Sequence, residues 1–266
     1  MQGVSASDGR PIDWGKTAQD YARYRPGPPL SFYHRLSGFG IGHSGQKLLD
    51  LATGTGVIAR QMAAQGCQVT ASDIAEDQVA MASALAKQQG LTIDFSVNPA
   101  EHCDYPTDTF DVITANQCFL YLDASTLMPL ILKWLKPDGV LVISHFSWLP
   151  RIDKIAQASE ALILEHNPNW SASDYSGHTA PAYPGLDRWM HYNGYFYYDE
   201  AIAFSRADWC GRIRASRGIG ASLTEAEVAT FDAAHDVLLR KIAGDTFTVT
   251  HRIDAHILRV GTSGGD

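Results

Sequence analysis

A glycine turn is the strongest chemical signal in the sequence. The segment Asp50–Gly56 (Asp-Leu-Ala-Thr-Gly-Thr-Gly) follows an apolar run and precedes residues that favour a helix. Glycines at such a turn let the backbone approach a ligand without a clash with a Cβ atom. The helix behind them offers free N–H groups and a partial positive charge. The turn therefore predicts a binding site for a ligand with an anionic group.

A carboxylate after the next apolar run extends this prediction. Asp73 follows residues 68–72, and a carboxylate at that place can accept two hydrogen bonds from ribose hydroxyls. These features alone do not fix the ligand, because Gly54-x-Gly56-x-x-Ala59 also fits the dinucleotide fingerprint of NAD enzymes. A glycine-rich turn without any ligand is the third interpretation.

The elements that position these residues alternate between strand and helix. Buried strands are predicted at 47–52, 68–72, 92–97, 110–115 and 140–145, with helices at 57–65, 76–89 and 127–135. Such alternation is typical of βαβ units, and right-handed crossovers narrow the topology to doubly wound folds. We expect an α/β, Rossmann-like doubly wound sheet of seven mostly parallel strands, with helices on both faces.

The flanking segments predict further elements. Residues 1–12 are polar and expected to be loose, and helices are expected over 13–24 and 30–36. Beyond Trp148 we expect a helix over 151–166, an aromatic-rich insertion to residue 194, a strand over 195–204 and one or two strands within 247–260. Capping boxes at Ser205 and Thr224 predict the starts of two helices.

Composition and charge argue against several classes of protein. The 266 residues are 45% hydrophobic with a net charge of −8, which suits a folded chain and disfavours a nucleic-acid partner. The N-terminus lacks the apolar core of a signal peptide, and no stretch reaches the roughly 18 apolar residues of a membrane span. The four cysteines form no CxxC pair and the histidines lack HxxxH spacing, so we expect no metal, no disulfide framework and a cytoplasmic location.

Three further motifs resemble the class I S-adenosylmethionine-dependent methyltransferases. Asp50 stands where that family carries an acid before its glycines, Ala100-Glu101 precedes a family-like segment ending in Phe110-Asp111, and Leu135–Leu141 resembles its "LkPgG.l" motif. The resemblance covers about residues 45–145. A narrower likeness, from Tyr21 to Pro26 and from Thr114 to Phe119, is to the methyltransferase type 11 or trans-aconitate methyltransferase-like group. In this chain Leu120-Tyr121 replaces the His-Trp pair common in that group, which leaves the substrate open.

The resemblance implies S-adenosyl-L-methionine as cofactor and S-adenosyl-L-homocysteine as product. It also implies one domain over 1–266, with an N-terminal lid (1–45), a cofactor-binding core (46–147), an insertion or substrate cap (148–194) and a C-terminal part of the sheet (195–266). Arg25 is expected to pair with the cofactor carboxylate, or else to be a solvated loop arginine. The cofactor-binding residues implied are Tyr21, Arg25, Asp50, Ala52, Thr53, Gly54, Gly56, Asp73, Ile74, Ala100, Glu101, Asn116 and Gln117.

Methyl transfer needs alignment and exclusion of water more than strong acid–base chemistry. A carboxylate acceptor needs no base, whereas a phenol or amine would use a nearby His or Tyr. The candidates are His145 and Tyr121, each with a structural alternative: a histidine bonded to backbone and a core aromatic. Expected substrate contacts are Phe119, Tyr121, Phe146, Trp148, Arg212 and Arg214, the arginines serving an anionic substrate unless they are solvated helix residues.

Three functions stay open at this point. The first is methyl transfer to a small molecule, with carboxylate or hydroxyl oxygen favoured over nitrogen, by a monomer or homodimer. The second is an NAD-dependent oxidoreductase, for which the sequence lacks a clear Tyr-x-x-x-Lys pair. The third is a non-catalytic protein that binds adenosylmethionine.

Overall fold

The computed structural model describes residues 13, 15–180, 183 and 185–260, which fall into two compact units. We call the unit of Gly27–Phe146, Thr179–Tyr197 and Ile253–Asp266 the sheet unit, and the unit of Met1–Pro26, Ser147–His178 and Tyr198–Arg252 the helical unit. The expected loose residues 1–12 lie outside the described part. Because the expected insertion (148–194) is divided between the two units, the single domain with those boundaries stays a prediction.

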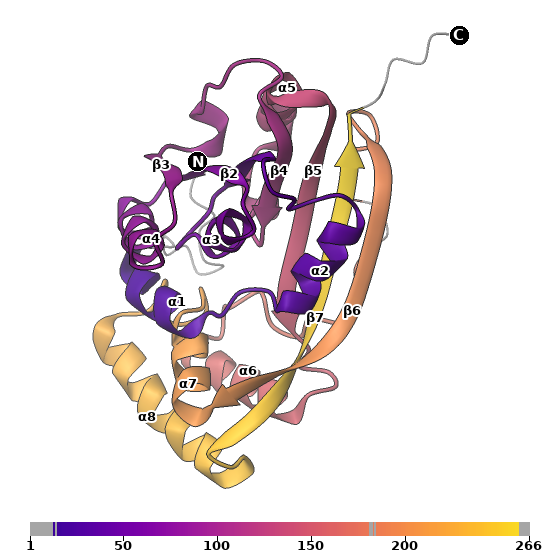
Figure 1. Ribbon diagram of the computed structural model, residues 1–266. Coiled ribbons are helices and arrows are strands. Elements are labelled where there is room, and N and C mark those ends of the chain that lie inside the picture. The colour runs from indigo at the N-terminus through magenta and orange to yellow at the C-terminus, as the bar shows by residue number, and fades with distance from the viewer. Residues whose placement is uncertain (1–12, 14, 181–182, 184, 261–266) are drawn as a thin grey trace. The chain divides into compact units, whose positions relative to one another are not determined.

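The strands form one seven-stranded sheet in the order β3-β2-β1-β4-β5-β7-β6, shown in Figure 1. Strands β1 and β2, β2 and β3, β1 and β4, and β4 and β5 pair in parallel. The order reverses between β1 and β4, which is the topological switch point where open α/β sheets bind ligands. The expected Rossmann-like doubly wound fold is confirmed. The strands are β1 (Lys47–Leu51), β2 (Gln68–Asp73), β3 (Ile93–Val97), β4 (Phe110–Asn116), β5 (Leu135–Trp148), β6 (His191–Ser205) and β7 (Thr246–Arg259).

Helices α3 and α4 pack against the strands around the glycine turn, as Figure 1 shows. Strand β1 is buried along almost its whole length, because its apolar run Leu48–Leu51 is covered on both faces. The helices of the sheet unit are α2 (Leu30–Gly38), α3 (Val57–Ala64), α4 (Glu76–Gln88) and α5 (Ala124–Trp134), with short 3-10 turns at Ala100–His102 and Phe119–Tyr121.

The helical unit is built on four helices, α1 (Ala18–Tyr24), α6 (Lys154–His166), α7 (Arg206–Arg214) and α8 (Glu225–Ile242), after a 3-10 turn at Gly15–Thr17. Helix α7 packs against α1 and α8, and α6 packs against α8. The capping box at Thr224 is confirmed, since its side chain accepts from the Glu227 N–H and the Glu227 side chain accepts from the Thr224 N–H. Ser205 accepts from the Asp208 N–H and so caps α7.

The start of strand β5 differs from the sequence prediction. Strand β5 begins at Leu135 rather than Val140, so Pro137-Asp138-Gly139 lies within the strand instead of ending a helix. A register shift between β4 and β5 absorbs these residues: Phe110 pairs with Leu135, and Val112 pairs with Val140. The segment 246–259 forms one long strand, β7, where one or two strands were expected. Within the described residues, no helix is long and apolar enough to span a membrane.

Candidate functional site

The glycine turn lies between β1 and α3, at the carboxyl end of the strand. Ala52, Gly54 and Gly56 all adopt left-handed backbone angles, with φ of +48°, +57° and +74°. A Cβ atom at Gly56 would lie 3.2 Å from the Cβ atom of Ala82, so glycine is needed there for space as well as for φ. The turn therefore brings its backbone close to α4, and no side chain projects from positions 54 and 56.

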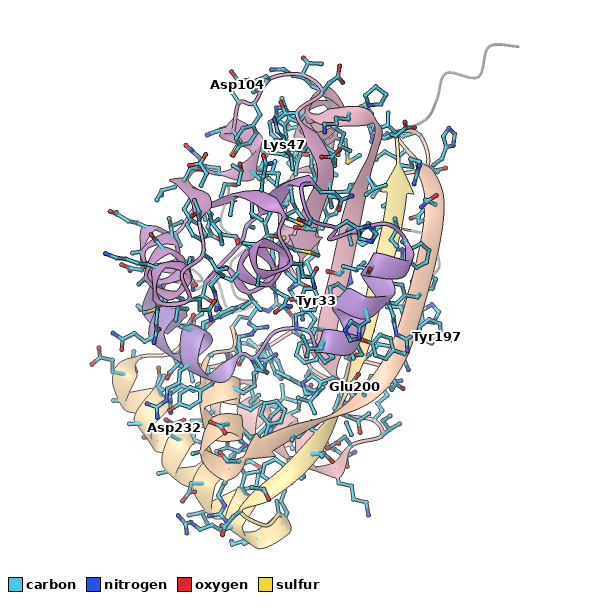
Figure 2. The ribbon with its side chains drawn as sticks, viewed as in Figure 1. Tyr33, Lys47, Asp104, Tyr197, Glu200 and Asp232 are labelled. Carbon is cyan, nitrogen blue, oxygen red and sulfur yellow. The ribbon has the colours of Figure 1, made fainter. Side chains whose placement is uncertain are left out.

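Asp50 is buried beneath the turn and holds it in place. Its carboxylate accepts hydrogen bonds from the hydroxyls of Thr53 and Thr114, both at 2.6 Å. Burial raises the pKa of Asp50 to about 6, against the lowering effect of these hydrogen bonds. On α2, Tyr33 is also buried, and burial together with the charge of Asp50 raises its pKa (Figure 2). The Asp50 side chain thus ties the turn to β4 through its own contacts.

Asp73, at the end of β2, joins the turn from the other side. Its Oδ2 atom accepts from the Gly54 N–H at 2.8 Å, and its Oδ1 atom accepts from the Ala75 N–H at 2.9 Å. Each carboxylate oxygen has a second lone pair, so the group can still accept from two hydroxyls. Ile74 follows it with its side chain 40% exposed, which offers an apolar surface beside the acid. Backbone N–H groups therefore fix the orientation of Asp73, whose role in ribose binding stays a prediction.

Glu101 carries a buried acceptor that has no donor among the described residues. Its Oε1 atom accepts from the Asp123 N–H at 3.0 Å, while Oε2 is buried and has no hydrogen-bond partner. An unsatisfied buried acceptor costs about 1–3 kcal/mol. Ala100, next to it, is buried. A ligand that donates a hydrogen bond here, such as an exocyclic amine of a purine, would satisfy Oε2.

The ends of β4 and β5 are bonded to each other beside the turn. Asn116 Oδ1 accepts from the Ser144 hydroxyl at 3.0 Å, and the Gln117 N–H donates to the Ser144 carbonyl at 2.9 Å. The Gln117 side-chain amide donates to the Phe146 carbonyl. Gln117 has a φ of +62°, so both Ala52 and Gln117 carry left-handed strain at the ends of adjacent strands. Strain of this kind concentrates at functional sites.

His145 forms a pair with a carboxylate that the sequence analysis missed. Its Nδ1 atom lies 2.9 Å from Oδ1 of Asp254, which is on β7 and fully buried. The ring of Tyr183 stacks on His145, with centroids 6.2 Å apart and an interplanar angle of 9°. The side chain of His145 is 20% exposed. The histidine is therefore oriented by a carboxylate and not by backbone, which was the structural alternative to a catalytic role.

A second histidine lies near Asp254. Nε2 of His256 lies 3.9 Å from Oδ1 of Asp254, and burial lowers the pKa of His256 so that this ring is neutral near pH 7. Burial also raises the pKa of Tyr183 to about 12. Oδ2 of Asp254 is buried without a hydrogen-bond partner among the described residues. Asp254 is thus a buried carboxylate in direct contact with His145.

Comparison with known proteins matches the same region. A family model described as a methyltransferase domain covers residues 48–139, which include the turn, Asp73 and Glu101. A ubiquinone biosynthesis O-methyltransferase of Cereibacter sphaeroides is 28% identical over 132 residues, 48% of this chain and 53% of that protein. The corresponding protein of Pectobacterium atrosepticum is 27% identical over 148 residues, 55% of this chain and 60% of that protein. The chain thus spans little more than half the length of these relatives.

A solved structure extends the likeness to the fold. Haemonchus contortus phosphoethanolamine N-methyltransferase 2, bound to S-adenosylhomocysteine and phosphomonomethylethanolamine, superposes with a TM-score of 0.55 at 17% identity, over 93% of this chain and 58% of that chain. The chain thus has the Rossmann-like fold of class I methyltransferases, and its residues 48–139 match a methyltransferase domain. S-adenosylmethionine is the cofactor that this likeness implies, and its adenosine would fit the Oε2 atom of Glu101, which has no donor among the described residues, and the open lone pairs of Asp73.

Other predicted site residues lie in the sheet unit near the same strand ends. Phe119 is buried and its ring meets Tyr183 edge to face, with centroids 5.3 Å apart. Phe146 is buried at the end of β5, and Tyr121 is half-buried in the 3-10 turn that follows β4. Their contacts with an acceptor stay predictions. In the described residues, no group of three His, Cys, Asp or Glu side chains is arranged to hold a metal ion.

The remaining predicted residues belong to the helical unit. The Arg25 guanidinium lies over the Tyr21 ring, 4.1 Å from its centroid, and the Arg212 guanidinium lies 4.8 Å from the centroid of Trp148. Arg214 forms ion pairs with Asp20 and Asp232, both on helices of the same unit. The structure therefore gives Arg214 carboxylate partners within the chain, whereas Arg212 is neither paired in this way nor solvated.

The residue that sequence reasoning missed, Asp254, left one signal in the sequence. It is a charged residue within an apolar stretch predicted to be a strand, as are His251 and His256. Polar residues in a buried strand require partners, so they mark a polar network. The sequence could not show that His145 is the partner, because 109 positions separate the two residues.

Proposed function

We propose that this methyltransferase transfers the methyl group of S-adenosylmethionine to a hydroxyl oxygen of a small molecule. The His145–Asp254 pair is the observation that carries the proposal. A histidine whose Nδ1 atom is bonded to a carboxylate keeps its Nε2 lone pair available as a general base. A carboxylate acceptor would need no such base, so the pair favours a hydroxyl. The names of the curated relatives, O-methyltransferases, support oxygen as the acceptor atom.

Different residues of the sheet unit bind different parts of S-adenosylmethionine in this proposal. Asp73 accepts hydrogen bonds from the ribose hydroxyls, Ile74 contacts the adenine, and Oε2 of Glu101 accepts from the adenine amino group. The backbone of the glycine turn lies along the methionine portion, together with Asn116 and Gln117. Asp50 does not contact the cofactor in this proposal. It accepts hydrogen bonds from Thr53 and Thr114, and these fix the shape of the turn.

S-adenosylmethionine supplies a methyl group on a sulfonium, which is a good electrophile. During transfer, the acceptor oxygen forms a bond to the methyl carbon while the bond from carbon to sulfur breaks, and the electron pair of that bond stays on sulfur. Nε2 of His145 takes the hydroxyl proton, and Asp254 stabilises the resulting imidazolium. His145 then releases the proton to solvent, so charge and atoms balance.

The proposal is tested by changing each member of the pair. General-base catalysis typically contributes about 10²–10⁴ in rate, so His145→Gln is expected to lower kcat with phenolic acceptors by that factor. Asp254→Asn is expected to lower kcat by about tenfold or more, because the amide no longer stabilises the imidazolium. His43→Gln, an exposed histidine on the same unit, is the matched control.

The measurement is transfer of labelled methyl from adenosylmethionine to panels of phenols, amines and carboxylic acids. Isothermal titration with S-adenosylhomocysteine runs in parallel, and its affinity should stay within about twofold in both variants. Transfer to carboxylic acids alone, or a kcat that His145→Gln leaves unchanged, would contradict the proposal. Binding of NAD in place of adenosylhomocysteine would overturn the assignment of S-adenosylmethionine as the cofactor.

A further inference from the structure

Arg212, on α7, is a buried cation without a carboxylate partner. Its side chain is 3% exposed, and its Nε atom has no hydrogen-bond partner among the described residues. The same part of the chain offers its guanidinium no carboxylate within ion-pair distance; its close contact is the ring of Trp148. Burying a charge without a partner is costly, by several kcal/mol as a rule. The chain therefore carries here a charge that its own residues leave uncompensated.

Arg214, two residues further along the same helix, differs from Arg212 because carboxylates of the same unit compensate its charge. Its Nε and Nη2 atoms donate to Asp20 at 2.5 and 2.8 Å, and its Nη1 atom donates to Asp232, labelled in Figure 2, at 2.5 Å. The indole of Trp148, the ring that contacts Arg212, donates to Glu160 at 2.6 Å, and the Glu160 carboxylate also accepts from the Asp174 N–H at 2.7 Å. Arg214 thus has carboxylate partners on two helices, whereas the described residues give Arg212 none.

A second guanidinium lies near the first. Helix α1 packs so closely on α7 that a Cβ atom at Gly211 would overlap the Tyr24 ring. Arg212 follows Gly211 in the sequence, and Arg25 follows Tyr24. The charge of Arg25, added to burial, lowers the pKa of Arg212 well below its ordinary range. The packing of two helices therefore brings two like charges together.

His251 supplies no negative charge to these two arginines. Its Nδ1 atom donates to the Val249 carbonyl at 2.9 Å, and burial together with the charges of Arg212 and Arg25 lowers its pKa to about 3, so the ring is neutral near pH 7. Tyr21 contributes a ring beneath Arg25. An anionic ligand is the group that would balance this cluster of Arg25 and Arg212.

We propose that Arg212 and Arg25 form a binding site for a small aromatic carboxylic acid within the helical unit. A guanidinium matches a carboxylate through two parallel hydrogen bonds, and the Nε atom of Arg212 is a donor without a partner among the described residues. The rings of Trp148 and Tyr21 favour a planar, aromatic body on the acid. Residues 48–139 match the methyltransferase domain, and Arg212 lies outside them. Recognition of a ligand particular to this chain is expected in such a part of the sequence.

The test is direct binding and does not require methyl transfer, so it can fail or succeed independently of the proposed function. Isothermal titration compares benzoate, phenylacetate and cinnamate with their uncharged amides. The acids are expected to bind at least about tenfold more tightly than the amides, which corresponds to a difference of about 1.4 kcal/mol in binding free energy. Arg212→Met should abolish that preference, Arg212→Lys should keep part of it, and Arg240→Met, an exposed arginine on α8, should leave it unchanged.

A second readout separates this role from a purely structural one. Since Arg212 is an uncompensated buried charge, Arg212→Met is expected to raise the Tm of the ligand-free protein. A lower Tm with acid binding intact would overturn the proposal, as would acids that bind no better than amides. Adenosylhomocysteine and methylthioadenosine, which lacks a carboxylate, form the last arm. A loss confined to adenosylhomocysteine would assign Arg212 to the cofactor and overturn the acid site.

Discussion

Single residues at the strand ends carry opposing demands of stability and function. Asp50 is the clearest case, because its carboxylate is fully buried and yet accepts two hydroxyl hydrogen bonds that shape the glycine turn. Burial wins over those hydrogen bonds and raises its pKa to about 6. Ionised Asp50 therefore destabilises the folded chain relative to a carboxylate in water. The residue keeps the turn in place at a cost that depends on pH.

This dependence has a definite sign. Between an unfolded pKa near 3.8 and a folded pKa of about 6, the folded chain binds the extra proton, so the contribution of Asp50 to stability falls as pH rises through that window. In Asp50→Asn this contribution is gone. Chemical denaturation of both proteins at pH 4 and pH 7 should show the stability of the variant relative to wild type rising by roughly 2–3 kcal/mol. Asp138→Asn, at an exposed position, is the matched control, and an equal change in it would refute the assignment.

At the scale of elements, the turn between β1 and α3 contains a strained backbone position that a substitution to glycine would relieve. Ala52 has a φ of +48°, in the region that costs a non-glycine residue about 1–2 kcal/mol. Glycine removes that cost but adds entropy to the unfolded chain. We expect Ala52→Gly to raise the free energy of unfolding by about 0.5–1 kcal/mol, measured by urea denaturation.

The matched control for this change is the same substitution in a helix. Ala84 is exposed in the middle of α4, where glycine should lower stability by about 1 kcal/mol. Opposite signs at the two positions are the expected result. A loss of stability at both would mean that the Ala52 backbone relaxes from its left-handed angle.

How much was predictable also differs by element. The strands β1, β2 and β4 were predictable because each is a short apolar run beside a helix, and the turn followed from its glycines and Asp73. The start of β5 was not, because a bulge opposite Phe110 keeps Pro137 and Gly139 inside the strand, and bulges leave no periodic signal. Asp254 and the burial of Arg212 were also beyond reach, since both depend on contacts between segments far apart in sequence.

At the scale of the whole molecule, the residues assigned to the cofactor are concentrated in one of the two units. Asp73, Glu101 and the glycine turn all belong to the sheet unit, and the family match lies within it. Strands β5, β6 and β7 contribute residues to both units. A ligand that binds only the folded chain stabilises it by mass action.

Adenosylhomocysteine at 100 times its Kd is therefore expected to stabilise the folded protein by about 2.7 kcal/mol, seen as a higher Tm in a thermal scan. Asp73→Ala should weaken binding by about 1–3 kcal/mol and reduce the shift at the same ligand concentration. Asp94→Ala, an exposed acid on β3, should preserve the shift. An undiminished shift in Asp73→Ala would show that this carboxylate does not hold the ribose.

The distance in sequence between His145 and Asp254 has a consequence for biosynthesis. Translation delivers the chain from its N-terminus at about 5–20 residues per second, so the 109 positions that separate the pair correspond to roughly 5–20 s on the ribosome. The turn, Asp73 and Glu101 are all synthesised before residue 145. A nascent chain can thus acquire the groups assigned to the cofactor well before it acquires the carboxylate assigned to orient the base.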